Sequence, residues 1–226
     1  MLMNTSSSSP VRVWDWSVRL FHWSLPVLLG LLWYYAGEDM DRHMLFAQIL
    51  MSLLLYRLIW GFVGTPYARF RHFLYHPRHV LAYVRASLSP QKPVYLSHNP
   101  LGGLMVLVLL GGLLLQGGTG LFATDDIFYT GPLYDYVSGD TADAMTRWHK
   151  RWFYWGLLVL VGLHLLAVLL YRLRGENLVG PMITGRKQAP ADRVADHLQQ
   201  EHAFPWLRFV LTAAMAWGAV EALFRL

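Results

Sequence analysis

Long apolar segments alternate with polar segments along this chain. Four of them are apolar over about 20 residues, which is long enough to cross a bilayer. They are residues 18–36, 44–63, 101–121 and 152–173. A weaker fifth segment, residues 206–224, carries Arg208 and Glu221 near its ends. Because hydrocarbon offers no hydrogen-bond partner to the backbone, each segment is predicted to be a helix. The pattern predicts an all-α integral membrane four-helix bundle with a fifth C-terminal transmembrane helix.

The polar segments set the boundaries around this bundle. Residues 1–10 include a run of serines and are predicted to be disordered. The four-helix unit is expected at residues 11–175, a cytoplasmic polar tail at 176–205 and the fifth helix at 206–226. Within the tail, residues 192–202 have the pattern of a short amphipathic surface helix. The first apolar segment is followed by no small-residue cleavage site, so it is expected to stay in the mature protein.

Charged residues divide unequally between the two sides of the membrane. If the segments alternate in direction, one side holds the basic residues Arg12, Arg19, Arg69, Arg71, Arg78, Arg85, Lys92, Arg172, Arg174, Arg186 and Lys187. The other side holds the acidic residues Glu38, Asp39, Asp41, Asp125, Asp126, Asp135, Asp140 and Asp143, with only Arg42, Arg147, Lys150 and Arg151 as basic residues. Positive charge is retained on the cytoplasmic side, so the N-terminus is predicted to be cytoplasmic.

Four histidines fall at matching depths in this topology. His22 lies early in an outgoing helix and His164 late in an incoming one, so both are near the cytoplasm. His43 and His149 open incoming helices and are therefore periplasmic. His164 lies about 22 Å beyond His149 along one helix, and both face within about 60° of one direction. The depths predict two pairs, His22–His164 and His43–His149.

A neutral imidazole in a helix bundle is the usual axial ligand of haem iron. A single histidine in an apolar helix is more often a hydrogen-bonded core residue, but several polar residues in one membrane bundle usually mark function. The two pairs favour two bis-histidine haems stacked along the bundle. A copper or zinc site stays open as an alternative. The chain has no cysteine, which excludes disulfides, iron–sulfur clusters, thiolate haem ligation and covalent c-type haem.

Three further polar residues lie near the cytoplasmic pair. Arg19 precedes His22 by three residues and is predicted to pair with a haem propionate, or else to snorkel to the interface. Arg57 carries the same two alternatives. His98 precedes the third segment, where Ser97 or Asn99 is expected to cap the helix. It is expected to face a propionate or a quinone headgroup, or else to be an ordinary surface residue. The remaining histidines, at positions 72, 76, 79, 197 and 202, are interpreted as solvated.

The chain resembles the bacterial cytochrome b561 family, which includes the b-type subunits of nickel–iron hydrogenases. The resemblance rests on residues 13–23 (VWDWSVRLFHW), 57–64 (RLIWGFVG), 98–103 (HNPLGG), 120–122 (GLF) and 148–150 (WHK), with His164. It covers about residues 11–187. It implies a four-helix di-haem b cytochrome with histidine ligands on helices one, two and four, in the bacterial inner membrane. The tail and the fifth helix are not part of the four-helix pattern.

These observations predict electron transfer through two haem b groups between the membrane quinone pool and a periplasmic redox partner, such as a c-type cytochrome or a hydrogenase. The acidic periplasmic side favours a basic partner. An alternative within redox chemistry is a superoxide- or hydrogenase-linked quinone oxidoreductase subunit. Alternatives of another class are a membrane anchor or assembly subunit and a transporter that relays protons through histidines.

Overall fold

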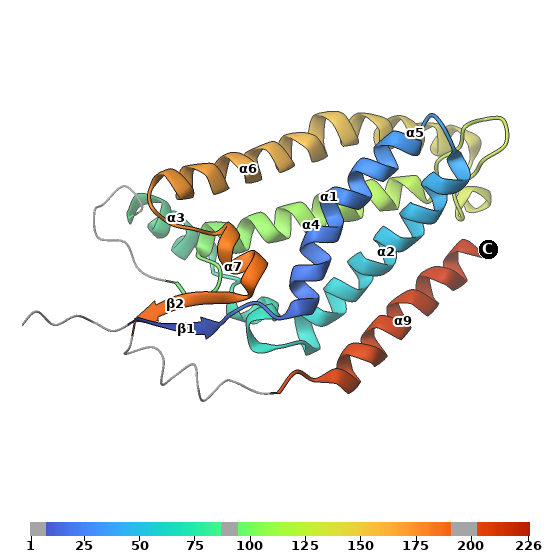
Figure 1. The fold of residues 1–226 in the computed structure, drawn as a ribbon. Helices are drawn as coiled ribbons and strands as arrows, with labels where there is room; N and C mark the ends of the chain where they lie inside the picture. The colour runs from blue at the N-terminus through green and yellow to red at the C-terminus, as the bar shows by residue number, and fades with distance from the viewer. Residues whose placement is uncertain (1–7, 87–94, 191–202) are drawn as a thin grey trace, which may run out of the picture.

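The computed structural model describes residues 8–86, 95–190 and 203–226. Its long helices lie side by side in an elongated bundle (Figure 1). They are α1 (Trp16–Tyr35), α2 (Met40–Val63), α4 (Pro100–Gly120), α5 (Gly139–Trp152), α6 (Leu158–Leu173) and α9 (Trp206–Phe224). The shorter elements are α3 (Pro77–Ala86), α7 (Val179–Thr184), the 3-10 turns Pro66–Ala68, Phe70–His72 and Tyr134–Tyr136, the π-helical turn Phe153–Leu157, and the strands β1 (Ser8–Arg12) and β2 (Arg186–Pro190).

Four helical stretches are long and apolar enough to cross a membrane. They are α2, α4, the continuous run Gly139–Leu173, and α9. The helix α9, expected to be the weakest span, is therefore among them. The helix α1, which the sequence predicts as the first span, has 20 residues and packs against α2, but it carries Arg19 and His22 and is not among these four. The chain is a multi-pass helical membrane protein.

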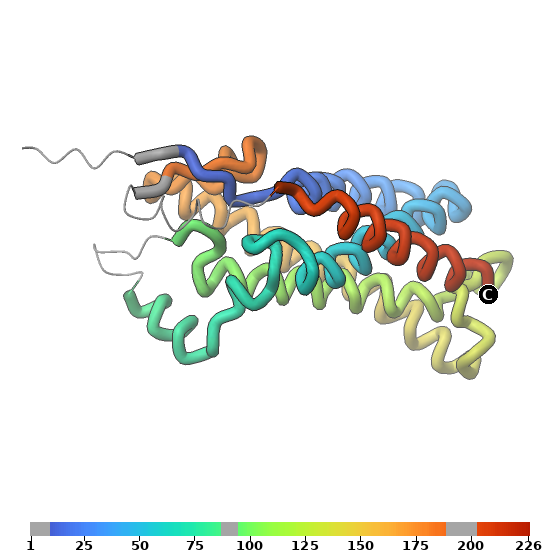
Figure 2. Tube along the Cα trace, turned by 90° about the horizontal axis from the view of Figure 1, so that it is seen from below, coloured from blue at the N-terminus to red at the C-terminus, as the bar shows by residue number. Residues whose placement is uncertain are grey.

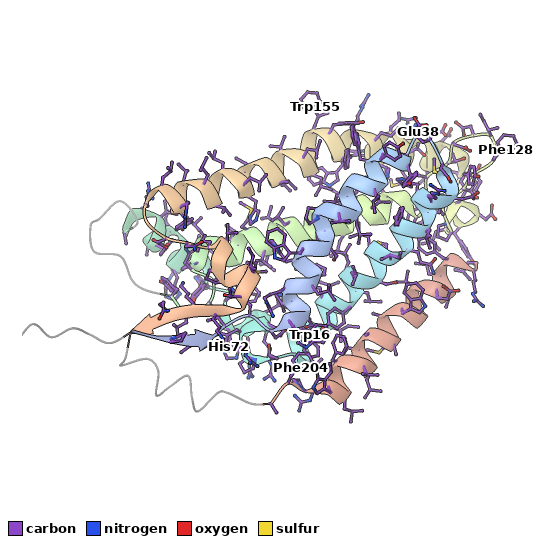
Figure 3. All side chains as sticks on the ribbon, viewed as in Figure 1. Trp16, Glu38, His72, Phe128, Trp155 and Phe204 are labelled. Atoms are coloured by element: carbon purple, nitrogen blue, oxygen red, sulfur yellow. The ribbon has the colours of Figure 1, made fainter. Side chains whose placement is uncertain are left out.

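The bundle has two chemically different ends. The end formed by residues 38–41 and 121–138 is called the acidic end. The end formed by β1, α3, α7 and β2 is called the basic end. Glu38 and Phe128 lie at the acidic end, and Trp16, His72 and Phe204 lie toward the basic end (Figure 3). The helices α1, α2, α4 and α9 and the continuous run Gly139–Leu173 each extend between the two ends (Figure 1), so each histidine has a defined position along the bundle.

Side-chain caps fix where the long helices begin. Asp15 accepts a hydrogen bond from Val18 N at the start of α1, and Asp39 accepts one from Arg42 N at the start of α2. Asn99 caps α4 by accepting from Gly102 N at 2.8 Å, and Pro100 takes the first helical position. This confirms the expected cap beside His98, with Asn99 rather than Ser97 in that role.

Part of the predicted polar tail folds back onto the basic end. The strand β2 pairs antiparallel with β1, from Arg12 opposite Arg186 to Ser8 opposite Pro190. Gly185 turns the chain with φ +77°, and its carbonyl accepts from Val13 N and Trp14 N. The predicted disorder over residues 1–10 is therefore wrong for Ser8–Pro10, whose ladder partners lie far away in sequence. Residues 1–7 and the amphipathic segment 192–202 fall outside the described residues.

The helix α9 packs along α2, and both views show the two helices side by side (Figures 1 and 2). Its start covers the basic end, where Phe209 lies edge-on to Trp16 with ring centres 4.6 Å apart. Farther along, Gln48 of α2 donates a hydrogen bond to Glu221 of α9. The same carboxylate accepts from Arg225 Nε at 2.7 Å, so Glu221 links the end of α9 to α2 while paired with a cation of its own helix.

A π-helical turn interrupts the helix that carries His149 and His164. It spans Phe153–Leu157, between α5 and α6. A Cβ at Gly156 would collide with the Trp152 indole, so glycine lets that ring fold back and donate to Gly112 O at 2.9 Å. A π-turn holds one residue more than an α-helical turn. The angle around the helix axis between His149 and His164 therefore changes from the predicted value of about 60° to about 40° in the opposite direction. Both still face the bundle interior.

Candidate functional site

Two pairs of histidines face each other across the bundle. His22 of α1 and His164 of α6 have ring centres 6.2 Å apart near the basic end. His43 of α2 and His149 of α5 have ring centres 6.3 Å apart near the acidic end. These are the pairs that the membrane depths predict, and their four histidines lie on four different helices. The structure brings together the four imidazoles that the sequence singles out.

The separation of each pair fits one metal ion between two imidazoles. With a metal–nitrogen bond of about 2.0 Å and about 1.1 Å from nitrogen to ring centre, imidazoles on opposite sides of one iron would have centres about 6.2 Å apart. Both observed separations are close to this value. A direct N–H···N hydrogen bond between the imidazoles would bring their centres to about 5.1 Å. The two pairs therefore have the spacing of axial ligands.

Backbone carbonyls fix the tautomer of both histidines at the acidic end. The Nδ1 atom of His43 lies 2.9 Å from Leu32 O, and that of His149 lies 2.9 Å from Gln116 O. A carbonyl only accepts, so Nδ1 carries the proton in each ring. The unprotonated Nε2 keeps its lone pair, which is the form that binds a metal.

Gln116 is a polar residue of this site that the sequence analysis missed. Its amide nitrogen lies 3.2 Å from Nδ1 and 3.1 Å from Nε2 of His149. A position in the ring plane equally far from both nitrogens would overlap Cε1, so the amide lies over the face of the ring. The lone pair of Nε2 therefore stays accessible. A single amide in an otherwise apolar helix was the available signal, because polar groups in membranes are costly.

Buried hydrogen-bond donors without an acceptor gather near the basic end. A buried polar group without a partner costs about 1–3 kcal/mol, so each implies a ligand or a rearrangement. Within the described part of the chain, such atoms are Trp16 Nε1, Arg19 Nε, His22 Nδ1, Arg57 Nη1, Ser97 Oγ and His98 Nδ1. Each can donate a hydrogen bond, and two belong to arginines. The set fits an anionic group with several oxygen acceptors, such as the propionates of a haem.

Arg57 is buried rather than turned toward the membrane surface. Its exposed fraction is 3%, and its guanidinium carbon lies 5.0 Å from the centre of the Phe70 ring. The snorkelling alternative is therefore wrong for this residue. Arg19 is tied to α7, since its Nη1 donates to Ile183 O while its Nε has no partner among the described residues. Both arginines hold positive charge beside the histidine pair at the basic end.

Asp15 accepts hydrogen bonds from several polar groups at the start of α1 and the end of α2. Its carboxylate, with 8% of the residue exposed, accepts from Ser17 Oγ at 2.7 Å, Val18 N at 2.9 Å, Trp60 Nε1 at 3.2 Å and Thr65 Oγ1 at 2.5 Å. It thereby joins the start of α1 to the end of α2 and the loop that follows. Residues 13–23, which carry the family resemblance, contain Asp15, Ser17 and Val18, whereas its other two partners, Trp60 and Thr65, lie far away in sequence.

His98 is an aromatic, uncharged part of the basic end. Its ring lies between Trp14 and Phe73, with both ring centres 4.6 Å away. Burial, followed by the charges of Arg57, Lys187 and His22, lowers the pKa of His98 to about 3. His98 is therefore neutral near pH 7, with Nδ1 buried and without an acceptor among the described residues. The ordinary-surface alternative is wrong, because the two aromatic rings enclose it.

The other described histidines stay outside this site. His72, His76 and His79 are exposed in or near α3, and positions 197 and 202 fall outside the described residues. Within the described ranges, no three or more histidine, cysteine or acidic side chains gather as a metal cluster. Each pair therefore offers two imidazoles, the number that haem iron takes on its axial sides, whereas zinc needs about four ligands.

Comparison with known proteins gives one match. A family model described as prokaryotic cytochrome b561 matches residues 13–185. This range runs from the loop before α1 to the turn after α7 and contains both histidine pairs. The helix α9 lies outside it. Neither the comparison with curated proteins nor that with solved structures finds a match.

Proposed function

Because the chain belongs to the prokaryotic cytochrome b561 family, we propose that it carries electrons across a membrane through two haem b groups, one at each histidine pair. The observation that supports this most directly is the spacing of 6.2 Å and 6.3 Å between the paired imidazoles. Two pairs at opposite ends of one bundle divide the membrane into two shorter electron-transfer steps. A bound haem supplies the one-electron chemistry of its iron.

The protein holds and orients the ligands. His43 and His149 present Nε2 because Leu32 O and Gln116 O hold their Nδ1 protons. His22 and His164 come from α1 and α6, so a cofactor between them joins two helices that are separated by α2, α4 and α5 in sequence. Apolar helices around both pairs exclude water and lower the local dielectric constant, which strengthens every charge interaction near the iron.

Residues of the basic end would bind the propionates of a haem held between His22 and His164. Arg19 and Arg57 supply positive charge there, and His98 supplies a neutral N–H donor. These contacts satisfy donors that otherwise lie buried and unpaired. They also attract electrons toward this end, because a nearby cation stabilises the reduced form of a haem more than the oxidised form.

The charge distribution supports an orientation of the two ends in a bacterial inner membrane. The basic end faces the cytoplasm, with the N-terminus, and the acidic end faces the periplasm. Quinone is then the redox partner near His98, and a soluble c-type cytochrome or a hydrogenase is the partner at the acidic end. The acidic side chains there favour a positively charged protein surface.

An optical spectrum of the purified protein with a haem count tests this proposal. We expect reduced b-type bands, two haems per chain, and oxidation of the reduced protein by a soluble quinone analogue. A colourless protein would point instead to an anchor or to a proton-relaying transporter. A single haem per chain would overturn the two-pair arrangement, and haem that no quinone oxidises would remove the quinone assignment.

A further inference from the structure

The segment between α4 and α5 forms a well-ordered turn at the acidic end. The Asp125 carboxylate accepts from the backbone N–H groups of Ile127, Phe128 and Tyr129 at 3.0, 2.9 and 2.8 Å. Thr124 and Thr130 form an isolated bridge across its base. Asp126 takes a left-handed conformation, with φ 63°, which a short polar side chain tolerates. The turn therefore holds its tip in one conformation.

This turn exposes large apolar side chains at the end of the bundle. Phe128 is 87% exposed and Ile127 is 74% exposed, and we call these two residues the apolar tip. Figure 3 shows Phe128 at the extreme acidic end of the molecule. Exposed apolar groups held rigidly in water mark a surface that another molecule covers.

Carboxylates surround the base of the tip. The Tyr129 hydroxyl lies among Asp41, Asp39 and Asp125, and desolvation together with these carboxylates raises the pKa of Tyr129. Arg42, which follows Asp41 in sequence, is already paired with Asp39 at 3.1 Å. The surface is thus an apolar centre with a negatively charged rim. This combination suits a partner with an apolar patch inside a positively charged ring.

The turn also joins the two helices that carry the histidine pair at the acidic end. Thr124 N donates to Thr146 Oγ1 at 3.0 Å, one helical turn before His149. Asp41, which contacts Tyr129, lies two residues before His43. A molecule seated on the apolar tip therefore lies next to the ends of the two helices that carry this pair.

We propose that the apolar tip and its acidic rim are the docking surface for a basic, soluble redox protein that exposes its haem edge within an apolar patch. This inference rests on the proposed function, because it names where the partner of the acidic-end haem binds. Short-lived electron-transfer complexes use small interfaces, and a rigid aromatic anchor with charged neighbours is sufficient for such a contact.

Binding of mitochondrial cytochrome c, a basic soluble haem protein, to the full chain in lipid nanodiscs tests this surface. We expect Phe128→Ser to raise the Kd by about tenfold at constant salt. The matched control is Phe62→Ser, which removes a 72% exposed phenylalanine at the other end of α2 and should leave the Kd unchanged. Asp126→Asn together with Asp135→Asn should weaken binding at low salt, and this difference should vanish at high salt.

An unchanged Kd in Phe128→Ser would overturn the docking surface. A second measurement asks whether the tip lies in lipid instead. Because the chain has no cysteine, Phe128→Cys gives a single site for a nitroxide label. Collisions with a water-soluble nickel complex are expected, whereas collisions mainly with lipid-dissolved oxygen would also overturn the proposal. Reduced b-type bands alongside failed binding would refute the docking surface alone, and absent bands would refute the proposed function.

Discussion

Gly120 of α4 lies directly against the imidazole of His149 of α5. A Cβ added to Gly120 would be 3.0 Å from Cε1 and 3.2 Å from Nδ1 of that ring. The ring has little room to yield, because its Nδ1 is held by Gln116 O. A glycine at this position therefore sets how closely the ligand-bearing helix approaches α4.

Replacing this glycine should disturb one haem and spare the other. We expect Gly120→Ala to shift the midpoint potential of the acidic-end haem or to lower its occupancy, because the added methyl group pushes the ring away from its present position. Potentiometric titration followed by optical spectra measures both. Gly111→Ala is the control, since a Cβ there meets no atom within 4 Å. Equal effects of the two variants would contradict the contact.

Replacing one histidine of a pair should remove the haem of that pair and leave the other haem bound. His164→Ala removes one ligand at the basic end, so we expect about one haem per chain with the acidic-end haem retained. His149→Ala should give the complementary result. A pyridine haemochromogen assay counts the haem, and electron paramagnetic resonance identifies which bis-histidine signal remains. Loss of the acidic-end signal in His164→Ala would show that the pairs are wrongly assigned.

Arg57 should raise the potential of the haem at the basic end. We expect Arg57→Gln to lower that midpoint potential by roughly 60 mV, equivalent to about 1.4 kcal/mol for one electron, because a buried cation favours the reduced haem. Arg57→Lys keeps the charge and should shift the potential less. The exposed Arg78 provides a control, and Arg78→Gln should leave both potentials unchanged. An equal drop in the lysine variant would assign the effect to packing.

Asp15 should stabilise the fold more than an exposed helix cap does. Asp15→Ala removes the cap of α1 and leaves Trp60 Nε1 buried without its acceptor. We expect this substitution to lower the free energy of unfolding by about 2–4 kcal/mol. Asp39→Ala removes the cap of α2 at a more exposed position and should cost only about 1 kcal/mol. Unfolding in detergent, followed by circular dichroism, compares them; a smaller loss for Asp15→Ala would contradict the role assigned to its buried hydrogen bonds.

The turn that carries the apolar tip should depend on pH. Hydrogen bonds from Tyr129 N and Ile127 N, with a smaller contribution from Phe128 N, lower the pKa of Asp125 from its ordinary value of 3.8. The stabilisation is therefore present above that value and is lost as the pH falls through the lower value of the folded protein. We expect amide protection of residues 127–129 to fall in that acid range. Asp125→Ala should show low protection at neutral pH, and unchanged protection there would be inconsistent with this cap.

Much of the site could be predicted because the sequence indicates the membrane depth of each residue. Apolar length sets the spans and charge sets their direction, so His22 and His164 fall at one depth and His43 and His149 at another. The directions in which His149 and His164 point around their helix were harder to predict. The π-turn between them changes the angle that separates them and has no clear sequence signal. Gln116 escaped notice because its role depends on a neighbouring helix.

The sequence by itself determined the helical membrane architecture, the family and the four histidines, since these follow from local apolarity, charge and motif. Only the tertiary structure decided the contacts between distant segments. It buried Arg57, enclosed His98 between two aromatic rings, and folded residues 186–190 against β1. It also placed α9 against α2. The physical reason is that local pattern fixes what each helix exposes, whereas partners across the bundle depend on how all the helices pack at once.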